Sequence, residues 1–274
     1  MRQKLTDFGN FDYRMSPIQS LAFLILKNHT RLLVDSNEPI ESFDFVIFRN
    51  ANVNWELAAA ASLYLRKHDI DYANGMEGSG VWTGKLAQMM LYALNGIPVP
   101  DTVCVRNYSD LQSLARQNFP YPYVLKDSVG IRGKNNYLVE SDNQSAEILQ
   151  SGPKLYLAQK YIPNDGDFRV LFVGMDSEPL IFKRASSGSS HLNNTSQGAT
   201  ATMVPLGEFP EGALRTARQT AKLFGREIAG VDILFDAEGE HYVLETNETP
   251  ALASGFALDD KVALVDNYMK EKLE

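Results

Sequence analysis

Residues 230–250 read GVDILFDAEGEHYVLETNETP, a pattern typical of a β-hairpin in which two apolar runs flank a turn that contains Gly239. Residues two apart in a strand point to the same face, so Glu245 and Asn247 project together, and a hairpin can bring Asp232 beside them. Two carboxylates and an amide oxygen are hard ligands of the kind that Mg²⁺ combines with substrate phosphates. The stretch therefore predicts a metal site, with an exposed hairpin that carries polar side chains at its edges as the alternative.

The length and composition predict a globular protein of one or two domains. The chain has 274 residues, of which 44% are hydrophobic, enough for a full core. A net charge of -8 argues against a nucleic-acid partner, because phosphate contacts need clustered Lys and Arg. The single cysteine, Cys104, excludes an intrachain disulfide, and the apolar run 21–26 is too short to span a membrane. We therefore expect a cytoplasmic chain with no membrane partner, and a homo-oligomer stays an open alternative.

The N-terminal part of the sequence predicts an α/β unit. Apolar residues at helical spacing over 18–25 predict a helix, and 31–34 predicts a strand. The apolar run 43–48 predicts a strand buried on both faces, and the Ala-rich stretch 55–68 predicts a helix. A strand followed by a helix is typical of an α/β unit in a parallel sheet.

A lysine stands at the start of the next expected helix. The preceding residues 75–84 are glycine-rich but lack the spacing of a phosphate loop that ends in Gly-Lys-Ser/Thr, because Leu86 follows Lys85. A lysine at a helix N-terminus opposes the helix dipole, so its presence favours a bound anion. The residues of this helix that we expect to face inward are Leu86, Met89, Met90, Ala93 and Leu94.

A second lysine lies at the end of a short strand. The strand 123–126 leads from Lys126 into a loop with Gly130 and Gly133, and a return strand follows at 137–139. Such a loop can cover phosphates with backbone N–H groups while the ammonium pairs with phosphate oxygens. A flexible, solvated hairpin is the equal alternative.

Further polar residues follow along the second half of the chain. The end of the apolar strand 155–162 can present backbone groups to an adenine edge, and Asp167 could bind ribose hydroxyls. Arg169 begins another strand, and Lys183 and Arg184 end the strand after it. The segment 186–198 is rich in Ser, Gly and Asn, which predicts a loop, and a helix over 211–224 leads into the hairpin.

The order of these features resembles the ATP-grasp superfamily. Within it, the sequence is most similar to the carboxylate-amine ligases related to the ribosomal-protein glutamate ligase. The resemblance extends over about residues 43–260. It rests on Lys85, PYVLK ending at Lys126, the glycine loop to Gly133, QKYI at 159–162, DFR at 167–169, Lys183-Arg184, 193–198, GVD ending at Asp232, and ETN at 245–247 with Pro250.

The resemblance implies a role for each of these positions. ATP would be bound by Lys85, Val124, Lys126, Ser128, Gly130, Gly133, Gln159, Lys160, Tyr161, Ile162, Asp167 and Leu244. Two Mg²⁺ ions, or Mn²⁺, would be bound by Asp232, Glu245 and Asn247. The reacting groups would be contacted by Arg169, by Lys183 or Arg184, and by Asn193, which would position the γ-phosphate or the metal.

The resemblance also implies the fold class. The expected protein is α/β with the α+β ATP-grasp fold, in which a short N-terminal α/β domain over 1–84 would precede an ATP-grasp domain over 85–274. The ATP-grasp domain would consist of two subdomains, about 101–158 and 159–274, that hold ATP between them. The sequence departs from the family at Ser196-Gln-Gly198, where relatives tend to have Arg-Gly-Gly, and this predicts a different acceptor site.

The implied function is an ATP-dependent ligase that joins a carboxylate to an amine, releases ADP and phosphate, and forms an amide through an acyl phosphate. Its partners would be a small-molecule or peptide carboxylate and an amine acceptor. Two alternatives stay open: a ligase that forms ester or amide bonds in ribosomal peptides, and a nucleotide-binding protein without turnover. The complete set of Asp232, Glu245 and Asn247 argues against the last of these.

Overall fold

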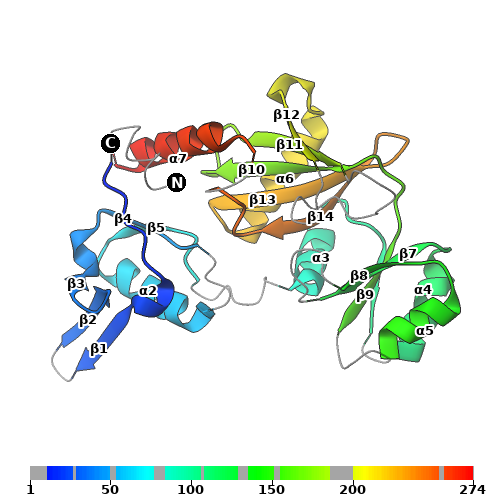
Figure 1. Ribbon diagram of the computed structural model, residues 1–274, viewed down its shortest axis with the longest axis horizontal. Helices are drawn as coiled ribbons and strands as arrows, with labels where there is room; N and C mark the ends of the chain where they lie inside the picture. The colour runs from blue at the N-terminus through cyan, green and yellow to red at the C-terminus, as the bar shows by residue number, and fades with distance from the viewer. Residues whose placement is uncertain are drawn as a thin grey trace.

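The computed structural model describes residues 11–26, 29–49, 54–76, 84–105, 108–128, 135–150, 155–185, 200–252 and 256–273. These residues form an N-terminal, a central and a C-terminal group of strands and helices, and the helix α3 (Lys85–Leu94) lies between the last two groups (Figure 1). None of the described helices is both long and apolar enough to cross a bilayer.

The N-terminal group combines an antiparallel sheet with a small parallel one. Its elements are η1 (Ile18–Ser20), β1 (Ala22–Leu26), β2 (His29–Val34), β3 (Glu38–Pro39), η2 (Ile40–Ser42), β4 (Phe45–Ile47), α2 (Trp55–Lys67) and β5 (Asp71–Ala73). Strands β1, β2 and β3 pair antiparallel in that order, whereas β4 pairs parallel with β5 across α2. The expected α/β unit is therefore confirmed.

Two expectations for this group are wrong in detail. The stretch 18–25 does not form a helix: after the single turn η1, the chain extends as β1 and pairs with β2, with Leu24 opposite Arg31. A short apolar run fits a strand as well as a helix, and the partner strand decides between them. The residues of β4 are half-buried rather than buried on both faces.

The central group is a four-stranded antiparallel sheet in the order β6-β9-β7-β8. Its elements are β6 (Thr102–Cys104), α4 (Tyr108–Asn118), β7 (Tyr123–Asp127), β8 (Asn136–Val139), α5 (Asp142–Gln150) and β9 (Tyr156–Lys160). Tyr123 and Leu125 pack with Leu111 of α4 and Leu149 of α5, so the helices cover one face. Alternation along β7 therefore directs Lys126 to the opposite face.

The C-terminal group is a five-stranded antiparallel sheet in the order β12-β11-β10-β13-β14. Its elements are β10 (Asp167–Val173), β11 (Leu180–Ala185), β12 (Thr200–Val204), η5 (Leu206–Glu208), α6 (Glu211–Phe224), β13 (Ile228–Phe235), β14 (His241–Asn247) and α7 (Leu258–Leu273). The expected hairpin and the helix over 211–224 are both present. Gly225 ends that helix at a φ of 70°, a conformation that glycine adopts without steric cost.

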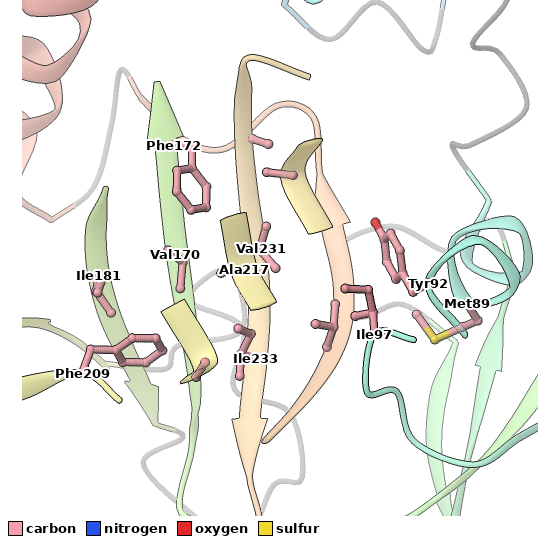
Figure 2. Close-up of a cluster of buried hydrophobic side chains, with 14 of the residues drawn as sticks. Met89, Tyr92, Ile97, Val170, Phe172, Ile181, Phe209, Ala217, Val231 and Ile233 are labelled. Carbon is pink, nitrogen blue, oxygen red and sulfur yellow. The ribbon is translucent and has the colours of Figure 1, made fainter. Parts of the chain in front are cut away.

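A large core fixes α6 against one face of this sheet. Ala213, Ala217 and Ala221, spaced four apart on α6, pack on residues such as Val170 and Val231, as Figure 2 shows for Ala217. Helical spacing of small residues lets the helix approach the strands closely. The opposite face of the sheet is left for α7 at one end and for polar side chains at the other.

Helix α3 packs beside the edge strand β14 with a different face from the one expected. Met89 is buried, as predicted, and Leu86 is half-buried, but Met90 and Leu94 are 55% and 76% exposed, and Ala93 is exposed as well. Gln88 and Tyr92 are buried in their place. The reason is the polar groups of Thr246 in β14: the amide of Gln88 bonds its backbone and the phenol of Tyr92 bonds its side chain, which a thioether cannot do.

Candidate active site

The predicted polar residues of the five-stranded sheet meet on one of its faces. Asp167 lies opposite Arg184, Arg169 lies opposite Asp232, and Asp232 lies opposite Glu245. Opposed residues in an antiparallel sheet point to the same face, so these strand positions form one polar layer. The neighbouring positions on the strands, such as Val170 and Val231, face α6 instead.

Within this layer two arginines and two aspartates form a connected ion-pair network. Arg169 binds Asp232 through two hydrogen bonds, Nε to Oδ1 and Nη2 to Oδ2, each 2.7 Å long. Nη2 of Arg184 lies 2.9 Å from Oδ2 of Asp232, and its Nε donates to Oδ1 of Asp167 over 2.7 Å. The side chains of Arg184 and Asp232 are 4% and 3% exposed, so the network is shielded from solvent at its centre.

Burial and ion pairing oppose each other in the network. Burial disfavours the charged form of Asp232, but the charges of Arg169 and Arg184 outweigh it and hold the pKa of this carboxyl below its usual range. Burial raises the pKa of Asp167 to about 6, against the opposing charge of Arg184. The network therefore keeps Asp232 ionised and makes Asp167 the more easily protonated carboxylate.

A glycine makes room for the arginine that reaches Asp232. A Cβ atom placed on Gly230 would lie 3.2 Å from Cδ of Arg169 and 3.2 Å from Cβ of Pro250. Either neighbour would have to move for a larger residue. The absence of a side chain at Gly230 in the Gly-Val-Asp sequence therefore leaves space for the ion pair between Arg169 and Asp232.

The predicted metal ligands lie on the two strands of the hairpin, and their chemistry fits a hard cation. Asp232 and Glu245 are paired across it, and Asn247 lies two residues beyond Glu245 on the same face. Oδ1 of Asn247 accepts from the N–H of Thr249 over 2.9 Å, and both oxygens of Asp232 accept from arginines. Two carboxylates and an amide suit Mg²⁺ together with phosphate oxygens. Because Arg169 bonds both oxygens of Asp232, a metal could bind Asp232 only if Arg169 shared or released this carboxylate.

The two predicted phosphate-binding lysines approach the hairpin from other parts of the chain. Nζ of Lys85 lies 3.7 Å from Oε2 of Glu245. The backbone N–H of Lys85 donates to the carbonyl of Ser128 over 2.9 Å, which joins the start of α3 to the end of β7. Burial lowers the pKa of Lys126 to about 8; the carboxylate of Glu245 opposes this shift and the charge of Lys85 adds to it. Cations and carboxylates from three elements thus share one electrostatic environment.

The predicted adenine-binding residues lie where the central sheet passes into the C-terminal one. Val124 is paired with Gln159 on the face of the central sheet opposite α4 and α5. Val124, Gln159 and Ile162 are buried, whereas Tyr161 and Leu244 are half-buried and Lys160 is exposed. The N–H of Lys160 donates to the carbonyl of Asp101 over 2.9 Å. Residues 159–162 lead from β9 towards β10, the strand that carries Asp167 and Arg169, whereas Val124 and Leu244 lie on β7 and β14.

The structure separates the two cations at the end of β11. Arg184 points into the ion-pair network, whereas Lys183 points to the other face of the sheet, where its Nζ lies 2.6 Å from Oδ2 of Asp165 and 5.7 Å from the centre of the Phe168 ring. Consecutive strand residues point to opposite faces, so only one of the two can face the network.

Three predicted site residues, Gly130, Gly133 and Asn193, lie outside the described residues, as does Ser196-Gln-Gly198.

Sequence reasoning missed two residues of α3 that contact β14, the strand that carries the predicted metal ligands Glu245 and Asn247 and is called the metal-ligand strand below. The side-chain amide of Gln88 makes hydrogen bonds with both backbone groups of Thr246, and the hydroxyl of Tyr92 donates to Oγ1 of Thr246 over 2.6 Å. Thr246 stands between Glu245 and Asn247. The available signal was the pair of hydrogen-bonding residues four apart on an otherwise apolar helix.

Comparison with known proteins places this arrangement in a family. A family model described as the RimK-like ATP-grasp domain matches residues 83–266. A probable alpha-L-glutamate ligase of Cellvibrio japonicus is 29% identical over 197 residues, which are 68% of this chain and 63% of that protein. One of Stutzerimonas stutzeri is 27% identical over 244 residues, 85% of this chain and 77% of that protein. The chain thus spans less than two thirds of the length of the Cellvibrio protein.

Solved structures share the fold. The ATP-grasp ligase PsnB, in a complex with a phosphomimetic variant of its minimal precursor, Mg and ADP, matches with a TM-score of 0.71 at 14% identity, over 100% of this chain and 93% of that one. A RimK domain ATP-grasp protein of Sphaerobacter thermophilus matches with a TM-score of 0.63 at 16% identity, over 97% and 92%. The expected ATP-grasp fold is confirmed.

Proposed function

Because the chain belongs to the RimK-like ATP-grasp family, we propose that it is an ATP-dependent ligase that joins a carboxylate to an amine. One observation carries the proposal: the two lysines expected to bind phosphate lie in the same electrostatic environment as the carboxylates expected to bind metal. Lys85 is 3.7 Å from Glu245, and the charges of Glu245 and Asp232 act on Lys126. Such a set of cations and hard oxygen ligands suits the polyphosphate of a nucleotide.

The proposed reaction has two steps. An oxygen of the substrate carboxylate attacks the γ-phosphorus of ATP, the bond to the β-phosphate oxygen breaks, and an acyl phosphate and ADP are formed. A neutral amine then attacks the acyl carbon, and the carbon–oxygen bond to phosphate breaks, which leaves an amide, phosphate and one proton. Mg²⁺ held by Asp232, Glu245 and Asn247 would neutralise the charge of the transferring phosphoryl oxygens.

The chain's own residues would bind and orient the reactants. Lys85 and Lys126 would pair with phosphate oxygens, and the backbone at 160–162 would bind adenine. Arg169 lies beside the metal ligands and would turn from Asp232 to the reacting carboxylate. A guanidinium near a developing oxyanion stabilises it by charge and by two directed hydrogen bonds. We propose Arg184, rather than Lys183, as the second cation of this step.

The same family membership supports the proposed division of the chain. The matching region begins at residue 83, close to the expected boundary at 84 between the N-terminal domain and the ATP-grasp domain. The relatives named probable alpha-L-glutamate ligase make glutamate the first amine to test.

A peptide-modifying ligase is the second candidate. The observation that favours it is the extent of the structural match: PsnB, solved with its minimal precursor, covers 98% of this chain, including the N-terminal group that the family model does not reach. Discrimination between the candidates requires peptides among the substrates tested. A nucleotide-binding protein without turnover is a third reading, which would need neither the arginines nor the complete metal set.

The deciding experiment is the release of ADP from Mg²⁺-ATP with a panel of amino acids, short peptides and small dicarboxylates. We expect release that depends on one carboxylate and one amine. Mass spectrometry of the product should then give the mass of the condensed pair minus one water. Tight Mg²⁺-dependent ATP binding without ADP release from any member of the panel would argue against a ligase for small substrates.

ATP binding is expected to take up protons near pH 8. With a pKa of about 8, Lys126 is half neutral at that pH in the free protein, and phosphate oxygens favour its charged form. About half a proton should therefore be taken up per ATP at pH 8, and affinity should fall as the pH rises above 8. Calorimetric titrations in two buffers of different ionisation enthalpy measure the uptake. Persistence of the uptake in Lys126→Met would refute the assignment to this lysine.

Substitutions at the end of β11 should differ in effect. Lys183→Ala removes a pair with the 84% exposed Asp165, so we expect kcat/KM to fall by less than about fivefold. Arg184→Lys keeps the charge but loses the planar fork that joins Asp167 to Asp232, and a loss of about 10²-fold is expected. Steady-state kinetics of both variants measure the contrast, and a larger loss for Lys183→Ala would reverse the assignment.

A further inference from the structure

The metal-ligand strand β14 is the last strand of its sheet. Among the described residues no strand pairs with it on the side away from β13, where the N–H of Val243 donates to the carbonyl of Pro98 over 2.8 Å. An unpaired edge is free to shift or fray, and metal binding requires its ligands to be held to within a fraction of an ångström. What covers this edge beside Glu245 and Asn247 therefore matters for the site.

The amide of Gln88 covers the edge at the residue between the two ligands. The N–H of Thr246 donates to Oε1 of Gln88 over 2.8 Å, and Nε2 of Gln88 donates to the carbonyl of Thr246 over 3.1 Å. These are the two hydrogen bonds that a neighbouring strand would make with one residue. Gln88 is 4% exposed, so water does not compete for this pairing.

Tyr92, one turn further along α3, binds the side chain of the same threonine. Its hydroxyl donates to Oγ1 of Thr246 over 2.6 Å, and its ring is fully buried beside β14 (Figure 2). Thr246 is opposite Val231, on the α6 face of the sheet, so Glu245 and Asn247 point to the other face. Three hydrogen bonds therefore fix the residue whose neighbours on both sides are the metal ligands.

The same helix begins with Lys85, whose Nζ lies 3.7 Å from Glu245. Lys85 and Gln88 are three positions apart in the sequence and lie on the same side of α3. A rigid helix that carries both groups sets the distance between the phosphate-binding ammonium and the metal-ligand strand.

We propose that Gln88, assisted by Tyr92, is a positioning residue that holds Glu245 and Asn247 in register for the metal of the bound nucleotide. This inference rests on the proposed function. Gln88 contacts the backbone of Thr246 and would act on the metal through it. Groups that orient metal ligands from behind commonly contribute about 10- to 100-fold to metal affinity.

The test uses Gln88→Met, which keeps the size of the side chain and removes both hydrogen bonds. Gln144→Met is the matched control, because Gln144 also makes two hydrogen bonds with backbone groups: it accepts from the N–H of Glu140 over 2.9 Å and donates to the carbonyl of Leu138 in β8 over 3.0 Å. Affinity for a non-hydrolysable ATP analogue is measured by calorimetry without metal and with Mn²⁺. Free Mn²⁺ is counted by electron paramagnetic resonance.

We expect Gln88→Met to weaken Mn²⁺ binding about tenfold, to change metal-free nucleotide affinity less than about twofold, and to raise the apparent KM for Mg²⁺. Gln144→Met should leave all three unchanged. Tyr92→Phe, which removes one hydrogen bond and keeps the ring, should weaken Mn²⁺ binding in the same direction, and it serves as the test if Gln88→Met does not fold.

Three outcomes would overturn the inference, and they can be told apart. If the parent protein gains no nucleotide affinity from Mn²⁺, the proposed function fails and the inference fails with it. If the parent gains affinity and Gln88→Met gains as much, only the inference fails. An equal loss of Mn²⁺ affinity in Gln88→Met and Gln144→Met would show a general loss of stability and would also refute positioning.

Discussion

Replacement of Glu245 by glutamine is expected to lower the rate of ADP release by about 10²- to 10³-fold while leaving the protein folded. The change keeps the shape of the side chain and removes its charge. Glu245 is 34% exposed and its ion pair with Lys85 is 3.7 Å long, so the fold depends little on it. In this variant the proposed metal site keeps only one of its two carboxylates. The lost negative charge would otherwise attract Mg²⁺ to the site beside the phosphates.

The measurement is initial-rate ADP release, with Mg²⁺ varied, alongside thermal unfolding of the free protein. Glu240→Gln is the control, since Glu240 lies in the exposed turn of the same hairpin and should leave the rate unchanged. Raised Mg²⁺ should recover part of the lost rate if the defect is in metal affinity. Unchanged ADP release in Glu245→Gln would remove this residue from the metal site.

Replacement of Asp232 by asparagine is expected to damage both activity and stability. Asp232 is 3% exposed and neutralises Arg169 through two hydrogen bonds, with Arg184 as its second partner. Removal of one member of a buried ion pair leaves an uncompensated charge and costs about 3–5 kcal/mol. The free energy of unfolding should fall by roughly the lower end of that range, because Asp167 still pairs with Arg184.

Urea unfolding of the free protein measures the loss of stability, and ADP release measures the loss of function. Asp165→Asn is the control: its ion pair with Lys183 is exposed, so a change below about 1 kcal/mol is expected. The contrast with Glu245→Gln is diagnostic, since that variant should lose activity alone. Full stability of Asp232→Asn would contradict a structural role of the Arg169 ion pair.

The stability contributed by this network should also depend on pH. The folded-state pKa of Asp232 lies below its ordinary value. Its ion pairs therefore add fully to the free energy of unfolding at any pH above the ordinary pKa, and this stabilisation is lost as the pH falls through the folded-state pKa. The folded-state pKa of Asp167 is raised to about 6. At pH 7 its ionised form therefore lowers the free energy of unfolding, and this loss decreases as the carboxyl is protonated below pH 6. The two carboxylates therefore act in opposite directions within one cluster.

Much of the site could be predicted because it depends on local pattern. The period of two in β13 and β14 put Glu245 and Asn247 on one face and Asp232 beside them, as the strand register bears out. The place of Lys126 near the end of β7 and the start of α3 at Lys85 also follow from residues within one element. The roles assigned to these residues remain predictions.

The sequence by itself therefore determined the hairpin, the helix over 211–224 and the order of the polar residues, because alternation and helical spacing act over a few neighbours. Only the tertiary structure decided which groups meet across the chain. Arg169 reaches Asp232 over 63 residues, and Gln88 reaches Thr246 over 158. It also decided that 22–26 is a strand, that Arg184 rather than Lys183 faces the network, and that α3 buries an amide. Each of these choices depends on a distant partner that satisfies a charge or a backbone group, and a local pattern carries no information about that partner.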